Sequence, residues 1–356
     1  MKKISSLEYN SLIFFVMRAS FMGLALGNII NITKQDSWIP GLISLFLGLI
    51  PLTIFIYLKN YDKDKNIAEL VLSLFKKSGI LINIIMITGG FLFALVSFSN
   101  LTNFVNSQFL FNTNHIIVAI CFIIPIIYAL AKGINAIAKT SLLTFFIVLF
   151  IIITLIIGVF DGIDLERLKP YLRANTLNII HSSAIIIAFN IVPLFLLTII
   201  PTNKIENYST KKTIVFYIIT LLSIINAIFL VLSVLGTDLA LLYQYPEFNI
   251  LKKFEVGDFI DRIESIFSLE WVIALIIQII IALYFVEKTI KTTFKTNEKT
   301  SKLIIIASCF ILIILNEKLF ITNATANVFY NGPMVIIMLS YIFLAFIIAI
   351  KAYLKK

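Results

Sequence analysis

The sequence predicts an all-α polytopic membrane protein of ten transmembrane helices, arranged as two inverted repeats of five with breaks in helices one and six. Three observations support this: an apolar composition, ten long apolar runs, and matching interruptions in the first and sixth runs. With 60% hydrophobic residues and a mean hydropathy of +1.02, 356 residues could not fold as one soluble globule. We expect residues 1–356 to form one integral membrane domain.

Crossing about 30 Å of hydrocarbon takes roughly 20 helical residues. Helices one to five would occupy about 10–160 and helices six to ten about 178–350, with an outer loop at 236–268. The third range is long enough to tilt or project from the bilayer, and the ninth is short. The predicted ranges are 10–32, 38–58, 80–108, 114–131, 140–160, 178–200, 212–235, 269–287, 302–316 and 333–350.

The basic residues predict the orientation. Of 29 Lys and Arg side chains, Arg18 lies inside a span, 20 lie on the side of the N-terminus and eight on the other side. Loops rich in Lys and Arg stay in the cytoplasm, so both termini are expected there. The net charge of +10 then reflects topology and attraction to anionic membrane lipid, and not nucleic-acid binding.

Two spans are interrupted at corresponding places. Glycine loosens a helix and proline removes a backbone donor, so both spans can unwind. Non-helical backbone at membrane depth lines a cavity or is buried in protein, and secondary transporters with inverted repeats bind substrates at such breaks. Alternatively, the glycines are packing notches and the proline an ordinary kink. The candidate ligand-binding residues are Gly23, Ala25 and Gly27 in helix one, and Phe189, Asn190 and Pro193 in helix six.

Arg18 is the basic residue that lies well inside a predicted span, five residues before Gly23. A charge at that depth is costly, so we expect Arg18 to face the bundle and to join the ligand-binding set. No acidic residue stands near the middle of another predicted span. The possible partners are a ligand carboxylate, carbonyls freed by the breaks, or water. Alternatively, Arg18 extends to the inner membrane interface.

A polar ladder ends the third span, where spacings of three and four residues place several side chains on one helix face. This face suits either an interhelical hydrogen-bond seam or the wall of a wet pathway. His115 and His181 fall near outer membrane ends, where they could sense pH or simply be interfacial. The ladder residues on the shared face are Ser99, Thr102, Asn103 and Asn106.

The loop at residues 245–271 is amphipathic. A helix start at Gly257 and Asp258 precedes apolar residues at helical spacing, while Asp258, Arg262 and Glu264 form a polar edge. We expect an ordered, helix-containing cap on the bundle mouth; the alternative is a helix that packs on the membrane surface.

The sequence lacks the motifs of several common enzymatic and metal-binding sites. The sequence shows no phosphate-binding glycine loop, no His, Cys and carboxylate set with metal spacing, and no GxSxG elbow. We therefore expect a protein that is not an enzyme, with neither a cofactor nor a metal site.

Four stretches carry a resemblance to a known family. They are KQDSWI at residues 34–39, KGINAIAK at 132–139, LERLKPYL at 165–172, and the YP…GDFIDRIE…W run that ends at Trp271. Over nearly its whole length, the chain resembles the B subunits of GerA-type spore germinant receptors, the GerAB-like branch of the amino acid, polyamine and organocation transporter superfamily. It departs from the family pattern at Ala19 and Leu26, at residues 113–114, and at Asn135.

The resemblance implies a subunit of the spore inner membrane, in a bacterium, that binds a small germinant, often an amino acid, in a transporter-like pocket. It also implies that this subunit acts with A and C receptor subunits. The alternative is a stand-alone secondary transporter of amino acids, because a receptor built on a transporter bundle keeps the same helix breaks.

Overall fold

The computed structural model describes residues 3–251, 263–320 and 323–355, except for the side chains of residues 263–267 and 323–325. The first half contains a broken first helix, a second span made of two shorter helices, and three further helices that are each long enough to span. Its elements are β1 (Ile4–Ser5), α1 (Ser6–Arg18), η1 (Phe21–Ala25), α2 (Leu26–Thr33), η2 (Lys34–Ser37), α3 (Trp38–Leu47), α4 (Leu49–Tyr61), α5 (Ile67–Phe75), α6 (Ser78–Gln108), α7 (His115–Lys132), α8 (Ile134–Gly158), η3 (Phe160–Gly162) and η4 (Leu165–Leu168).

The second half begins with a helix whose winding changes along its length. Its elements are α9 (Thr176–Ile186), η5 (Ile187–Ile191), η6 (Val192–Ile199), η7 (Thr202–Lys204), β2 (Ile205–Glu206), α10 (Thr210–Leu242), α11 (Pro246–Leu251), α12 (Ile263–Phe294), α13 (Glu298–Leu319), α14 (Asn323–Phe329), η9 (Tyr330–Met334) and α15 (Val335–Leu354).

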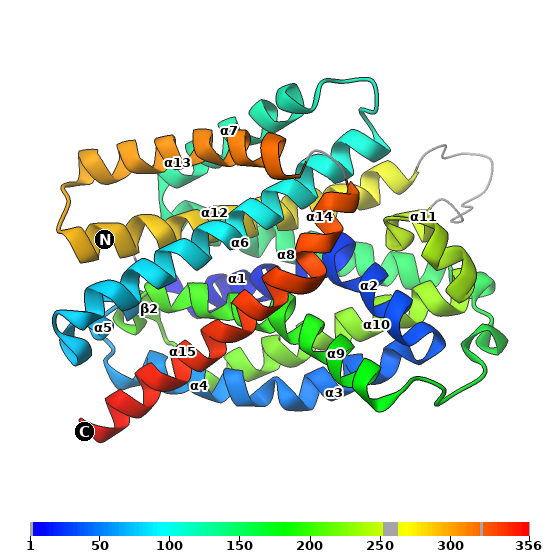
Figure 1. The fold of residues 1–356 in the computed structure, drawn as a ribbon, viewed down its shortest axis with the longest axis horizontal. Coiled ribbons are helices and arrows are strands. Elements are labelled where there is room, and N and C mark those ends of the chain that lie inside the picture. The colour runs from blue at the N-terminus through cyan, green and yellow to red at the C-terminus, as the bar shows by residue number, and fades with distance from the viewer. Residues whose placement is uncertain (1–2, 252–262, 321–322, 356) are drawn as a thin grey trace.

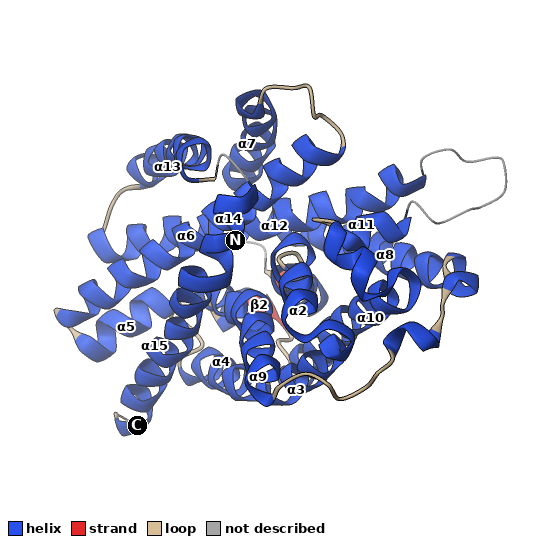
Figure 2. Ribbon diagram, turned by 45° about the vertical axis from the view of Figure 1, so that its right-hand side comes forward, coloured by secondary structure: helices blue, strands red, loops and turns tan. Residues whose placement is uncertain are grey.

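The first helix lies inside the bundle. In Figure 1, α1 runs through the middle, and it packs against α8, α10 and α12. α6 runs along α12, while α3 and α4 lie along the bottom of the view. Figure 2 shows α7 and α13 side by side at the periphery. Any groove beside α1 is therefore enclosed by helices from both halves of the chain.

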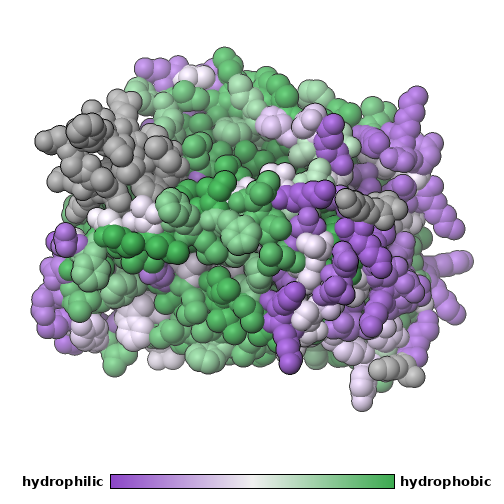
Figure 3. Space-filling view, turned by 180° about the vertical axis from the view of Figure 1, so that it is seen from behind, coloured by the Kyte–Doolittle hydropathy of each residue, from purple (hydrophilic) through white to green (hydrophobic). Residues whose placement is uncertain are grey.

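Eight helices of the described chain are long and apolar enough to cross a membrane. One of them, Ser6–Tyr61, covers two predicted ranges, and α13, which holds the ninth range, is not among the eight. All ten predicted ranges fall on helices, although α13 has 22 residues and is longer than predicted. A broad hydrophobic band separates two more polar ends in Figure 3. The chain is an integral membrane protein.

Both chain ends lie at the left end of the bundle in Figure 1. There, β1 pairs in parallel with β2, so the start of the chain is hydrogen-bonded to the segment after η6. The buried Lys59 ammonium donates a hydrogen bond to the Ile200 carbonyl, and Thr202 Oγ1 donates to the Lys59 carbonyl at 2.6 Å. This end of the bundle is closed by contacts between the first, second and sixth spans.

Local sequence explains several element boundaries. Ser5 and Glu8 form a capping box at the start of α1, and Asn66 and Glu69 form another at α5. Gly133 both ends α7 and begins α8 with φ 82°, a torsion that favours glycine. The family-like stretch at residues 132–139 is therefore the tight turn between two helices.

Candidate functional site

The first helix is broken where the sequence predicts. α1 ends at Arg18, and Met22 (ψ 131°) and Gly23 (φ 75°) leave the helical region before the chain resumes as α2. A Cβ on Gly23 would lie 2.4 Å from Asn100 Oδ1 and 2.8 Å from Tyr245 Cε1. Both the torsion and the close packing therefore require glycine at position 23.

The carbonyl groups around this break receive hydrogen bonds from side chains of other helices. An unpaired carbonyl buried at membrane depth is costly, so these donors stabilise the unwound segment. The donor side chains belong to α6, η5 and α12, so the broken segment is hydrogen-bonded to helices from both halves of the chain. The bonds are Gln278 Nε2 to Val16 O (2.7 Å), Asn190 Nδ2 to Met17 O (2.7 Å), Trp271 Nε1 to Ala19 O (3.2 Å) and Asn100 Nδ2 to Met22 O (2.9 Å).

The sixth span differs from the prediction of a broken helix. Residues 187–191 wind as a π-helix and residues 192–199 as a 3₁₀-helix, with no interruption between them. Pro193 lies in the first turn of the 3₁₀ segment, directly after the π-helical residues, so its missing N–H removes one bond of a continuous helix. The span nevertheless stays wound, and its winding changes from π to 3₁₀ next to the proline.

The predicted site residues are only partly brought together. Gly23 forms the break, Asn190 reaches the carbonyl of Met17 in the first span, and Phe189 and Ala25 are fully buried. Gly27 lies within α2, and nothing stands within 4 Å of where its Cβ would be. Pro193 lines a separate small cavity with residues of α6, α12 and α15.

Arg18 has an acidic partner that the sequence reasoning missed. Its guanidinium forms an ion pair with the carboxylate of Glu270, and the Arg18 and Glu270 side chains are only 9% and 5% exposed. The guanidinium also lies 5.8 Å from the centre of the Phe14 ring. Glu270 was not among the predicted partners, which were a ligand carboxylate, freed carbonyls and water. The alternative that Arg18 extends to the inner interface was wrong, because the side chain is buried against Glu270.

The described part of the outer loop is a buried cap over the break. Tyr245 and Phe248 of this loop pack on Phe104 of α6 and Trp271 of α12, with the Phe104 and Trp271 ring centres 4.0 Å apart. Tyr245 is 2% exposed and Phe248 is 3% exposed. Of the predicted cap, the structure describes the start, where α11 packs on the bundle. The predicted helix start, Asp258, Arg262 and the side chain of Glu264 lie outside the described residues.

A partly open cavity adjoins the break beneath this cap. Its apolar wall comes from α8, α10 and α11. Its polar groups include three buried charged residues, Arg18, Glu247 and Glu270. Of the predicted site residues, only Arg18 lines it. The remaining lining residues are Met22, Ile151, Ile152, Leu155, Ser223, Asn226, Ala227, Leu230, Val231, Phe248, Ile250, Leu251, Ser268 and Trp271.

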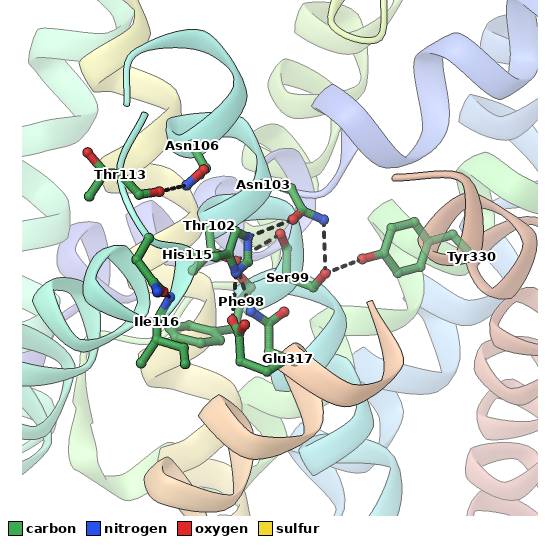
Figure 4. Close-up of polar contacts among 12 residues, drawn as sticks. Phe98, Ser99, Thr102, Asn103, Asn106, Thr113, His115, Ile116, Glu317 and Tyr330 are labelled. Atoms are coloured by element: carbon green, nitrogen blue, oxygen red, sulfur yellow. Dashed lines mark hydrogen bonds and ion pairs between the residues drawn. The ribbon is translucent and has the colours of Figure 1, made fainter. Parts of the chain in front are cut away.

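The polar ladder of α6 forms a hydrogen-bonded seam (Figure 4). His115 lies between Glu317 Oε1 (2.6 Å) and Asn103 Oδ1 (2.9 Å), and Asn103 Nδ2 donates to Ser99 Oγ at 3.3 Å. Tyr330 ends this series of hydrogen bonds by donating to the same Ser99 oxygen at 2.7 Å. These partners confirm the seam interpretation for this face of α6.

Two of the family-like stretches meet at the opposite side of the bundle. The buried Asp36 carboxylate accepts hydrogen bonds from the main-chain amides of Leu172 (2.7 Å), Arg173 (2.5 Å) and Ala174 (2.7 Å). We call this arrangement the Asp36 clasp. It joins the loop after α2 to the segment that leads into α9.

Comparisons with known proteins agree with this architecture. A family model described as "Spore germination protein" matches residues 3–325. The chain belongs to this family of spore germination proteins. Spore germination protein A2 of Bacillus subtilis is 25% identical over 244 residues, which cover 67% of the chain and 65% of that protein. Spore germination protein KB of the same organism is 28% identical over 189 residues, covering 52% and 50%. The chain thus matches between half and two thirds of the length of each relative.

Two solved structures show the same fold at low identity. A nucleobase-cation-symport-1 family transporter, in a closed conformation with bromovinylhydantoin bound, is 14% identical with a TM-score of 0.65, and the match covers 95% of this chain and 78% of that one. The Eremococcus coleocola manganese transporter is 11% identical with a TM-score of 0.60, covering 94% and 75%. The chain therefore combines membership of the spore germination family with a fold that it shares with these two transporters.

Proposed function

We propose that this protein is a B-type subunit of a spore germinant receptor, in which a small germinant binds within the transporter-like bundle. The observation that supports the proposal is the cavity next to the break in the first helix, with three buried ionisable side chains in its wall. A ligand bound there contacts both the unwound segment and the helices that pack around it. The family match supports a role in germination.

The ligand acts by shifting a conformational equilibrium. Binding shifts such an equilibrium only if the affinities for the two states differ. The break provides that difference, because four side chains now hold its carbonyls and each of these bonds depends on the relative position of two spans. The predicted residues Gly23, Ala25, Gly27, Phe189, Asn190 and Pro193 would tune this movement, with Arg18 at the cavity.

An amino acid is the proposed germinant. The proposed location is the spore inner membrane with both termini in the cytoplasm, and the proposed partners are the A and C receptor subunits. The expected orientation follows from the lysine-rich loops, which lie on the side of the N-terminus.

A germination assay tests the proposal. Spores that lack this chain should lose their response to one nutrient germinant, and expression of the chain should restore it. Normal germination of the deleted spores with every nutrient would refute the receptor role. Concentrative uptake of amino acids by the purified protein in liposomes, without partner subunits, would favour the transporter alternative.

A further inference from the structure

Glu247 is a buried acidic residue without an ion-pair partner among the residues that the structure describes. It lies in α11, is 6% exposed, and lines the cavity. Its carboxylate oxygens accept no hydrogen bond from a described side chain, although the backbone amides of Glu247 and Gly23 favour its ionised form. The nearby Arg18 guanidinium is already bound to Glu270.

Among the residues that the structure describes, the charges of the cavity wall therefore do not cancel. Arg18 carries one positive charge, whereas Glu247 and Glu270 together can carry two negative charges. Burial raises the pKa of Glu247 to about 8, against the opposing influence of neighbouring backbone amides and Arg18. A buried carboxylate without a partner is strongly disfavoured, and a cation in the cavity would relieve this cost.

The rest of the cavity restricts the kind of cation. Its wall is mostly aliphatic and aromatic, from Ile151, Leu155, Leu230, Ile250 and Trp271. Hard metal ions require several oxygen ligands, and the described residues contain no group of three side chains that could hold a metal. A cationic head next to Glu247 with an apolar body against the aliphatic wall fits both features.

We propose that Glu247 is the subsite for a ligand ammonium group, and that the cavity beneath α11 takes a small primary amine with a branched apolar body. Arg18 holds Glu270 away from that ammonium group, so one carboxylate is left for the ligand. The proposal depends on the proposed function only for the role of this ligand as a germinant.

Binding to the purified full-length protein in lipid nanodiscs tests the subsite. The probes are isopentylammonium, isopentanol and 4-methylpentanoate, which share a branched body and differ in the charge of the head. Isopentylammonium should bind to the wild type, and the other two should bind at least tenfold more weakly. Glu247→Gln should weaken isopentylammonium binding at least tenfold, because the variant keeps the shape and loses the charge.

Two further variants accompany Glu247→Gln: a surface variant that removes an exposed carboxylate, and a variant that fills the cavity. Glu166→Gln changes a carboxylate of η4 that is 74% exposed and bound to Lys169, and this variant should bind the amine like the wild type. Ala227→Phe fills the cavity from α10 while Glu247 is kept, and it should also block the amine. If Glu247→Gln does not fold, this second variant still decides the outcome.

Equal binding of the three probes, or amine binding that survives both Glu247→Gln and Ala227→Phe, would overturn the subsite. The outcomes that refute the subsite can be told apart from those that refute the proposed function. Spores that respond to a germinant through this chain, while the purified protein binds no amine, would refute the subsite alone. Amine binding in a protein whose deletion leaves germination unchanged would refute the receptor role alone.

Discussion

The side-chain amide of Asn190 donates a hydrogen bond of 2.7 Å to the main-chain carbonyl of Met17. This bond joins the rewound part of the sixth span to the last turn of α1, just before the break. Both groups are fully out of solvent, so the bond replaces one that the unwound segment cannot make with water.

Asn190→Ala should therefore destabilise the protein. Removing the donor leaves the Met17 carbonyl without this bond, at a cost of about 1–3 kcal/mol. Asn60→Ala is the matched control, because Asn60 is exposed and bonds within its own helix. Thermal unfolding in detergent measures both variants, and equal melting temperatures would contradict the importance of this link.

Substitutions at the two glycines of the first span should differ sharply. Gly23→Ala puts a side chain at φ 75° and within 2.4 Å of Asn100 Oδ1, so it should lower the melting temperature and the germinant response. Gly27→Ala enters open space within a helix and should be neutral or stabilise by up to about 1 kcal/mol. The germinant concentration response of spores with normal protein levels checks this pair. Equal effects at both positions would refute it.

Breaking the pair of Arg18 and Glu270 should be more harmful than replacing it. Arg18→Gln leaves the buried Glu270 carboxylate without its cation, which costs about 3–5 kcal/mol. The double variant Arg18→Met with Glu270→Leu should recover most of this loss, because no charge then stays unpaired. A double variant less stable than Arg18→Gln would show that the pair itself stabilises the fold.

Stability without ligand should fall as the pH rises through the neutral range. The pKa of Glu247 is raised from 4.5 to about 8 by burial, so between these values the unfolded chain has released a proton that the folded protein still binds. Stability contributed by this group is then complete below about pH 4.5 and declines towards pH 8. The groups that face it are Arg18, Glu270 and Tyr245, and burial also raises the pKa of Tyr245.

Glu247→Gln isolates this dependence. The variant should raise the melting temperature more at pH 8 than at pH 5, because it removes the group that must ionise. Glu166→Gln, on the surface, should shift neither value. A Glu247→Gln effect of equal size at both pH values would contradict the predicted protonation.

The long apolar runs predicted the membrane-spanning helices well, because each span must satisfy its own backbone and present apolar side chains to lipid or protein. It could not tell which glycine breaks the first span. Gly23 and Gly27 have the same chemistry, and only packing against Asn100 and Tyr245 distinguishes them. The predicted break in the sixth span was wrong, because the chain continues from a π-helix into a 3₁₀-helix next to Pro193 without an interruption.

A buried acidic residue at the outer end of α12 was not predicted from the sequence. Glu270 stands at the edge of a predicted span, where an acidic residue usually faces water, and its burial depends on the aromatic cap contributed by Tyr245 and Phe248. Glu247 was missed for the same reason, since it belongs to a loop in the sequence and to the cavity wall in the fold. Adjacent Trp271 was the available signal, because a loop that ends in a large aromatic residue can fold back on the bundle.

The Asp36 clasp limits how the bundle can move. One carboxylate holds three consecutive amides of the segment before α9, and α2 and α9 also pack against each other. These contacts tie the outer half of the first span to the start of the sixth span, so we expect the two to move together. We expect any movement of this unit relative to α1 to have its hinge at the break near Gly23.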